Sequence, residues 1–339
     1  MDWFERLTGF REGAYADVQS KLQVEGNMLH SLVNGHRYGV GEFEVASLQT
    51  LRERAQGPSG LPGRLTVRNV QGDVRAMHQE PQYAGALFQV ASQFNMLEMV
   101  SPSVTPEQGV TRYAHDRTQG PACAIAAGAG TIYRNYFAPA GGGHGQTHDR
   151  QLDGLADMGL ALGRAVGPPV TALWSMRNGY ALCSREGLAA ISKHLEGLGP
   201  DEVDALRGLL RIGVQRDVEV TDGDGDGPQR QLVSQAYCSA LPVAYSRLPA
   251  SLWKSFASLV LEAAYEATLC AAVMNARRGV SNIVLLTRLG GGAFGNDDDW
   301  IDAAMHRALT IVRRCELDVR LVSYGAPPRS MLVLERAFN

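Results

Sequence analysis

Apolar residues follow two different spacings along this chain. Strands are predicted where apolar residues alternate with polar ones or run together briefly, at 64–70, 86–92, 216–220, 283–286 and 318–324. Helices are predicted where apolar residues recur every three or four positions, at 121–136, 149–166, 252–278 and 299–314. A long polar connection is predicted over 102–120. Because strands and helices alternate, we expect a three-layer α/β/α fold around a mixed sheet.

The first 58 residues are predicted to form a helical extension. Helical spacing is found at 2–11, 15–33 and 45–55. The stretch 56–63, rich in glycine and proline, then marks a boundary. The chain is therefore divided into an N-terminal helical accessory segment, residues 1–58, and a larger domain, residues 59–339.

Two glycine-rich loops are the main indication of function. The segment 290–296, Gly-Gly-Gly-Ala-Phe-Gly-Asn, follows the predicted strand 283–286 and precedes a predicted helix. That order presents bare backbone N–H groups and the positive end of a helix to a phosphate. The segment 141–145, Gly-Gly-Gly-His-Gly, also precedes a predicted helix. A tight turn would explain either loop alone, but two such loops can hold a dinucleotide-like ligand from both sides.

Aspartates follow both loops. Asp149 and Asp153 are four residues apart, so a helix would place them on one face, beside a phosphate and able to act at a glycosidic carbon. A helix N-cap and a favourable first-turn charge would explain the same pair. The run Asp297, Asp298, Asp299 would repel a diphosphate. It therefore predicts a cation nearby, either a divalent metal or an arginine guanidinium, although N-capping explains one member.

Composition narrows the class of protein. Hydrophobic residues make up 45% and charged residues 20%, and the formal net charge of -3 argues against nucleic-acid binding. Five scattered cysteines without a CxxC pair indicate reduced thiols.

No signal peptide and no membrane-length apolar run are recognised, so a cytoplasmic location, or delivery into a host cytoplasm, is expected. The segment 222–227 mimics the start of a calcium loop, but Val233 stands where the bidentate glutamate belongs, so a hairpin tip is expected there and not a calcium site.

The chain resembles the macrodomain fold, specifically its poly(ADP-ribose) glycohydrolase-like branch. Four segments carry the resemblance: 70–74 with Asp73, 88–95 ending in Asn95, the triple glycine 141–143 followed after seven residues by Gln-Leu-Asp at 151–153, and 290–297. The resemblance implies that Asp73 binds the adenine amine and that Asn95 lies near the proximal ribose. It implies that Phe294 packs on a ribose and that Asp153 takes the place of the catalytic glutamate.

Two departures from this pattern bear on the substrate. Asp153 stands where the branch has its catalytic glutamate, and Leu152 where it has the neighbouring one. Losing one methylene moves a carboxylate by more than about 1 Å, enough to change which linkage is cleaved. The sequence is therefore most similar to the bacterial effector-type enzymes that remove single ADP-ribose groups from arginine.

We therefore expect a macrodomain-like ADP-ribosylhydrolase, without a cofactor, that cleaves the N-glycosidic bond between ADP-ribose and a protein side chain, with arginine favoured. The expected catalytic residues are Asp149, Asp153, Asp297 and Asp298. The expected ligand-binding residues are Asp73, Asn95, Gly141, Gly142, Gly143, Gly145, Gln146, Gly290, Gly291, Gly292, Ala293, Phe294, Gly295 and Asn296. The expected partners are ADP-ribose and ADP-ribosylated protein, with no nucleic acid and no membrane, and the chain is expected to be a monomer. Two alternatives stay open: a reader that binds ADP-ribose without turnover, and a hydrolase of free ADP-ribose derivatives.

Overall fold

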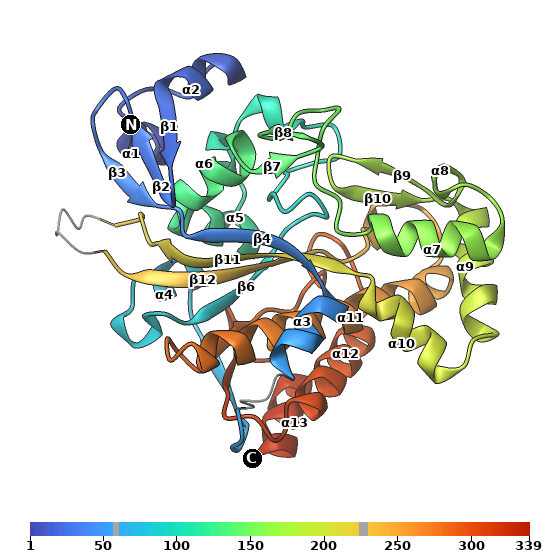
Figure 1. The fold of residues 1–339 in the computed structure, drawn as a ribbon. Coiled ribbons are helices and arrows are strands. Elements are labelled where there is room, and N and C mark those ends of the chain that lie inside the picture. The colour runs from blue at the N-terminus through green and yellow to red at the C-terminus, as the bar shows by residue number, and fades with distance from the viewer. Residues whose placement is uncertain (57–60, 224–229) are drawn as a thin grey trace.

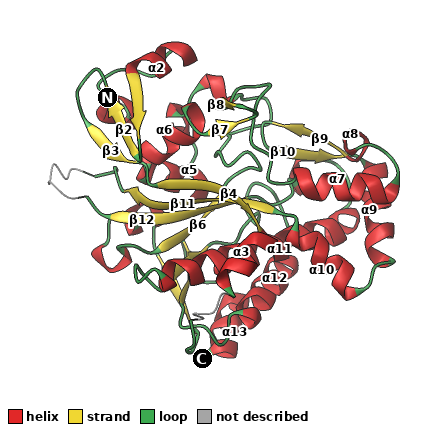
Figure 2. Ribbon diagram, viewed as in Figure 1, coloured by secondary structure: helices red, strands yellow, loops and turns green. Residues whose placement is uncertain are grey.

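A mixed seven-stranded sheet forms the centre of the computed structural model, which describes residues 1–56, 61–223 and 230–339 (Figures 1 and 2). In spatial order its strands are β4 (Glu42–Ser47), β11 (Arg211–Glu219), β12 (Leu232–Cys238), β6 (Leu87–Ala91), β13 (Ile283–Leu286), β14 (Asp318–Ser323) and β5 (Thr66–Gln71). The strands from β12 to β5 are parallel to one another, and β11 is antiparallel to both of its neighbours. The carboxyl ends of the parallel strands therefore meet at one edge of the sheet.

Helices cover both faces of this sheet (Figure 1). On one face are α3 (Leu48–Ala55), α11 (Ala250–Arg277), α12 (Asp298–Ile311) and α13 (Arg329–Phe338), and on the other are α5 (Gln119–Ala126) and α6 (Gly128–Tyr136). The side chains of β13 alternate accordingly: Val284 and Leu286 join the core beneath α11, whereas Leu285 joins the core on the opposite face. The predicted three-layer α/β fold is confirmed.

The remaining elements lie around this centre. The helices are α4 (Val74–Met77), α7 (Ala156–Val166), α8 (Val170–Leu173), α9 (Arg185–Glu196) and α10 (Pro200–Gly208). Two short hairpins are formed by β7 (Pro139–Ala140) with β8 (Gly143–His144) and by β9 (Trp174–Arg177) with β10 (Tyr180–Cys183). The 3-10 helices are η1 (Pro81–Tyr83), η2 (Pro106–Gln108), η3 (Thr111–His115) and η4 (Val243–Tyr245).

Helix α11 is the central helix of the larger core. Within the described part of the chain it is the one helix long and apolar enough to cross a membrane by those two criteria. The core helix of a globular protein meets the same criteria, and 89% of the most apolar window of α11 is buried inside the structure. Its buried carboxylate, Glu266, lies 2.5 Å from nitrogens of both Arg52 and Arg307, so the charge is paired.

The prediction that residues 1–58 form a helical extension is right only in part: each predicted helical stretch contains a helix, but four strands lie between the second and the third. After α1 (Trp3–Thr8) and α2 (Tyr15–Lys21), the chain forms a three-stranded sheet of β1 (Leu22–Glu25), β2 (Met28–Ser31) and β3 (Arg37–Gly39). Gly26, at a φ of 59°, turns β1 into β2, which a continuous helix over 15–33 cannot accommodate. Strand β4 is an edge of the main sheet and α3 packs on α11, so residues 42–55 belong to the larger fold. The predicted boundary at 58 and 59 lies outside the described residues.

Two predicted helices also differ from the structure. The helix expected over 149–166 begins only at Ala156, because residues 147–150 form a turn and Asp153 accepts a hydrogen bond from the backbone of Leu155. The helix expected over 121–136 is divided at Ala127, whose φ of -113° and ψ of 56° are not helical. Most of the segment 222–227, which mimics a calcium loop, lies outside the described residues.

Candidate functional site

A cleft lies at the carboxyl edge of the parallel strands. It consists of an inner hollow of about 150 Å³ and an outer hollow of about 770 Å³. The two hollows share four lining residues, Asp116, Gln119, Thr287 and Arg288. Residues that directly follow the strands line it: Gly72 and Asp73 after β5, Ser92 and Gln93 after β6, Ala240 after β12, Thr287 and Arg288 after β13, and Tyr324 after β14. Ligands of open α/β sheets bind at this edge, and the volume suits a nucleotide.

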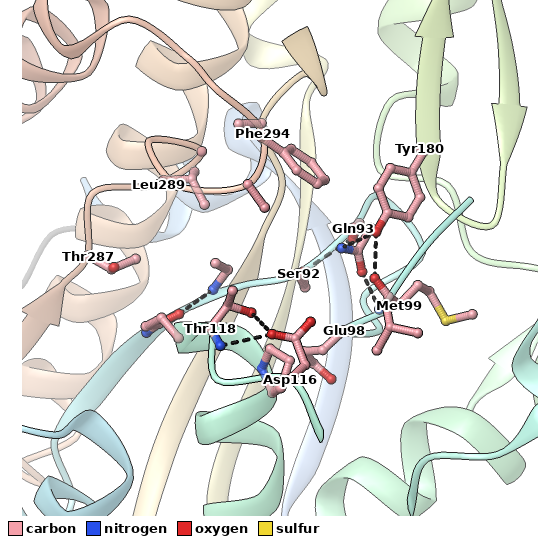
Figure 3. Close-up of a pocket in the computed structure, with 18 of the residues that line it drawn as sticks. Ser92, Gln93, Glu98, Met99, Asp116, Thr118, Tyr180, Thr287, Leu289 and Phe294 are labelled. Carbon is pink, nitrogen blue, oxygen red and sulfur yellow. Dashed lines mark hydrogen bonds between the residues drawn. The ribbon is translucent and has the colours of Figure 1, made fainter. Parts of the chain in front are cut away.

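The second glycine-rich loop forms one wall of the inner hollow (Figure 3). It is closed on itself, because the backbone N–H of Asn296 donates to the carbonyl of Gly290 at 2.9 Å and that of Gly295 to Gly292 at 3.1 Å. Gly290 has a φ of 75°, and a Cβ there would lie 2.5 Å from that of Ala240, so glycine is required.

This loop presents free donors to the cleft. In the described part of the chain, no acceptor is bonded to the backbone N–H groups of Gly290, Gly292, Ala293 and Phe294. All four residues line the inner hollow. Successive unpaired N–H groups in a loop before a helix are a binding site for a phosphate. The predicted role of this loop is therefore chemically possible in the folded chain.

Arg288 supplies a positive charge where the two hollows join. Its guanidinium donates to Asp302 at 2.6 Å and to Asp298 at 2.7 Å, both on α12. Burial works against the charge, but these hydrogen bonds outweigh it and raise the pKa of Arg288 above its ordinary value. The cation predicted from the aspartate run is therefore an arginine. In the part of the chain that the structure describes, no group of three or more histidine, cysteine, aspartate or glutamate side chains is arranged to hold a metal ion.

Three aromatic rings surround the mouth of the inner hollow. The ring centroid of Phe294 is 5.3 Å from that of Tyr180 and 5.6 Å from that of Tyr245. The hydroxyl of Tyr180 donates to the carbonyl of Met99 at 2.6 Å, which fixes the ring (Figure 3). Phe294 is thus held in an aromatic cluster, with its ring on the cleft wall, available to a sugar or to a planar cation.

Carboxylates occupy the opposite wall, in the loop 92–118 between β6 and α5. Asp116 and Glu98 lie across the hollow from Phe294 (Figure 3). Asp116 is half-buried and accepts hydrogen bonds from the backbone N–H of Thr118 at 2.9 Å and from its hydroxyl at 2.7 Å. This holds the carboxylate in one orientation and leaves it without an ion pair among the described residues.

Glu98 lines the inner hollow but is only 1% exposed. It accepts two hydrogen bonds from Arg134, at 2.9 and 3.2 Å, and Arg134 in turn stacks 3.7 Å above the ring centre of Tyr237. Burial raises the pKa of Glu98, while the charge and hydrogen bonds of Arg134 oppose that rise. We therefore assign the buried pair of Glu98 and Arg134 a structural role in the wall of the hollow.

Neither carboxylate of this loop is among the predicted site residues. The part of the loop that holds Asp116 has no hydrophobic period and is predicted only as a polar connection over 102–120, which does not include Glu98. Its length is the signal that could have marked it, since a connection of this length inside a compact domain is usually functional.

The first glycine-rich loop does not line the cleft. Gly141 and Gly142, with φ values of 52° and 79°, form the tip of the β7–β8 hairpin. Gly143 belongs to β8, and Gly145 packs against the backbone of Tyr136. The prediction that this loop opens a helix is wrong, because the loop is itself the turn of a hairpin and α7 begins eleven residues after Gly145, at Ala156.

The other predicted residues near the first loop are also outside the cleft. Asp149 and Asp153 line a separate hollow beside Asn178, and the prediction that they share a helical face is wrong. Burial raises the pKa of Asp153. Asn95 and Gln146 are buried, and Gln146 donates to the backbone carbonyl of Asn95 at 3.0 Å, which ties two loops together.

The remaining predicted residues, Asp73 and those of the second loop, fall into two groups: some line the cleft and others shape the loop. Asp73, Gly290, Gly292, Ala293 and Phe294 line the cleft. Gly291, Gly295 and the buried Asn296 shape the loop. Asp297 is the N-cap of α12 and accepts from the backbone N–H of Asp299 at 2.9 Å, whereas Asp298 orients Arg288.

Comparison with known proteins yields similarity at the level of solved structures. No family model matches the sequence, and no curated protein matches it. The chain is similar to poly(ADP-ribose) glycohydrolase from Thermomonospora curvata, with 13% identity over 96% of this chain and 95% of that one and a TM-score of 0.43. It is also similar to poly(ADP-ribose) glycohydrolase from Deinococcus radiodurans in complex with ADP-ribose, with 12% identity over 87% and 92% and a TM-score of 0.44. Sequence identities and TM-scores this low carry no conclusion about function. A function for this chain is therefore inferred from the residues of the cleft.

Proposed function

We propose that this chain binds ADP-ribose in the cleft and hydrolyses the N-glycosidic bond that joins it to a protein arginine. The observation that carries the proposal is the order of groups along the cleft. Asp73 lines the outer hollow, Arg288 and the carboxylate of Asp116 lie at the junction, and the free N–H groups of the loop 290–294 line the inner hollow.

This order matches the parts of ADP-ribose. A carboxylate such as Asp73 accepts hydrogen bonds from the exocyclic amine of a base. Arg288 and the free N–H groups suit the diphosphate, which needs both charge and donors. The ribose that carries the bond to be cleaved then reaches the inner hollow, beside Asp116.

Asp116 is the candidate general base. Its carboxylate takes a proton from water, and the water oxygen attacks the anomeric carbon. The carbon–nitrogen bond breaks with its electron pair left on the arginine nitrogen, and the released guanidine takes up the proton from Asp116, which restores the carboxylate and the charged arginine. The carboxylate also stabilises the positive charge that develops on the ribose ring. The hydrogen bonds from Thr118 keep Asp116 oriented for this step.

Arginine as the target side chain is supported by the rings around the inner hollow. A guanidinium is planar and stacks on aromatic faces, and Tyr245 and Phe294 provide such faces in the hollow that Asp116 also lines, with the buried ring of Tyr180 packed against both. A glutamate or serine linkage would gain nothing from this combination of rings and negative charge.

A reader that binds ADP-ribose without turnover is the second candidate. The observation that favours it is the ion pair of Glu98 with Arg134, which leaves Asp116 as the unpaired carboxylate of the inner hollow among the described residues. Glycosidases ordinarily use two carboxylates.

One experiment separates these candidates. Free ADP-ribose is measured after incubation with proteins that carry ADP-ribose on arginine, glutamate or serine, and with small ADP-ribose conjugates, while calorimetry measures ADP-ribose binding. Release from arginine alone is the expected result. Binding without any release would make the chain a reader, release from the small conjugates alone would indicate a small-molecule hydrolase, and neither binding nor release would refute the proposal.

A further inference from the structure

Glu12, in the connection between α1 and α2, joins the N-terminal segment to the loop that carries Asp116. One carboxylate oxygen accepts from the backbone N–H of Val110 at 2.8 Å and from the hydroxyl of Tyr136 at 2.8 Å. The other accepts from the backbone N–H of Thr111 at 2.7 Å and from its hydroxyl at 2.6 Å. A carboxylate that accepts four hydrogen bonds fixes the groups that donate them.

The fixed residues begin the short helix η3, and Asp116 directly follows its last residue, His115. The backbone N–H of Tyr113 donates to the carbonyl of Val110, and that of Asp116 to the carbonyl of Tyr113, both at 3.1 Å. Tyr113 is 1% exposed, so the middle of this segment is anchored in the core. Hydrogen bonds therefore lead without a break from Val110, which Glu12 binds, through Tyr113 to Asp116.

Gly109 shows how closely Glu12 is fitted to this loop. The φ of Gly109 is 80°, and a Cβ on Gly109 would lie 2.4 Å from the carboxylate of Glu12. Because residue 109 has no side chain, the carboxylate of Glu12 fits directly beside Val110 and Thr111, whose N–H groups it accepts from.

We propose that Glu12 is a positioning residue for the cleft, and that the N-terminal segment acts by holding Asp116 in place. The segment thereby completes the site from a part of the chain that is distant in sequence. The effect on turnover rests on the proposed function, whereas the effect on the loop does not.

The test compares Glu12→Gln with three other variants. Glu12→Gln replaces an acceptor by a donor and breaks one pair of contacts, and Thr111→Val removes one donor but keeps the backbone. Tyr136→Phe removes the donor from α6 and leaves both loop N–H groups bound to Glu12. Asp2→Ala removes the N-cap of α1, which accepts from Glu5, and touches no residue of the loop.

Hydrogen exchange by mass spectrometry is measured over 109–118 and over α11, together with the release of ADP-ribose. Glu12→Gln is expected to speed exchange over 109–118 alone and to lower kcat about 10- to 100-fold, because a small misplacement of a catalytic group has effects of that order. Thr111→Val should show a smaller change in the same direction. Tyr136→Phe and Asp2→Ala should leave exchange over 109–118 as in the wild type.

Unchanged exchange over 109–118 in Glu12→Gln, or an equal increase in α11, would overturn the proposal. The same holds if Tyr136→Phe loosens 109–118 as much as Glu12→Gln does, since the effect would then come from α6. If the wild type neither binds nor releases ADP-ribose, the proposed function fails, and the exchange result still decides the role of Glu12.

Discussion

The guanidinium of Arg288 lies 2.6 Å from a carboxylate oxygen of Asp302, so the positive charge of the cleft is fixed to the helix that follows the glycine loop. Asp298 adds a second contact at 2.7 Å, but its side chain is 76% exposed and so contributes less. The loop N–H groups and the guanidinium therefore belong to one rigid unit, formed by the end of β13 and the start of α12.

Removal of the guanidinium should weaken ADP-ribose binding. Arg288→Met keeps much of the side-chain volume but loses a charge-assisted contact worth about 1.5–3 kcal/mol, so calorimetry should give a Kd about 10- to 100-fold higher. Asp302→Asn should weaken binding less, because Arg288 keeps its charge and its contact with Asp298. Equal affinity in Arg288→Met and the wild type would place the diphosphate elsewhere.

Two glycines of the loop should respond differently to a methyl group. Gly290→Ala would place a Cβ 2.5 Å from that of Ala240 at a φ of 75°, so it should lower the free energy of unfolding by about 1–3 kcal/mol. Gly292→Ala meets no atom within 4 Å and should leave the Tm close to that of the wild type. Thermal denaturation of the two variants checks this, and an equal loss of Tm would contradict the loop geometry.

The buried pair of Glu98 and Arg134 should matter for stability. Glu98→Gln leaves the charge of Arg134 without its partner, at a site where both side chains are 0% exposed. Breaking such a pair costs about 3–5 kcal/mol, so the urea midpoint should fall sharply. Glu98→Gln combined with Arg134→Met should regain part of that loss, whereas an additive loss would argue against coupling.

His78 predicts a loss of stability on the acid side of neutrality. It stacks on Phe88 at 3.8 Å and bonds to the carbonyl of Val74, and burial lowers its pKa to about 4. The unfolded chain binds the proton below about pH 6.5 and the folded protein only near pH 4. The stability that neutral His78 contributes to the free energy of unfolding is thus fully present above pH 6.5 and is lost as the pH falls toward 4.

The expected size of this effect is about 2 kcal/mol between pH 7 and pH 5, measured as the free energy of unfolding in urea. His78→Gln, which does not titrate, should show a smaller difference between the two pH values. An identical difference in the variant and the wild type would assign the acid sensitivity to other groups.

The sequence was most informative where the signal is local. The loop 290–296 follows a strand directly, and a strand end in a parallel sheet lies at the ligand-binding edge whatever its neighbours. The same argument places Asp73, which follows β5. The prediction of a phosphate loop at the triple glycine 141–143 is wrong, because three glycines suit a hairpin tip as well as a phosphate loop.

The carboxylates of the cleft could not be predicted from local patterns. Asp116 and Glu98 lie on an irregular loop, and they reach the glycine loop only because β6 pairs with β13 in the sheet. That pairing joins residues almost two hundred positions apart, which no periodicity encodes. The helix expected to hold Asp149 and Asp153 failed for a related reason, since Gln146 accepts a hydrogen bond from the backbone of Leu152 and holds that segment as a loop.

The most direct test compares two aspartates that line different hollows. Release of ADP-ribose from arginine-ADP-ribosylated protein is measured for the wild type, for Asp116→Asn in the cleft and for Asp153→Asn in the separate hollow. The account predicts that Asp116→Asn loses at least about 100-fold in kcat while it still binds ADP-ribose, and that Asp153→Asn keeps near-wild-type activity. Full activity in Asp116→Asn, with activity lost in Asp153→Asn, would contradict it.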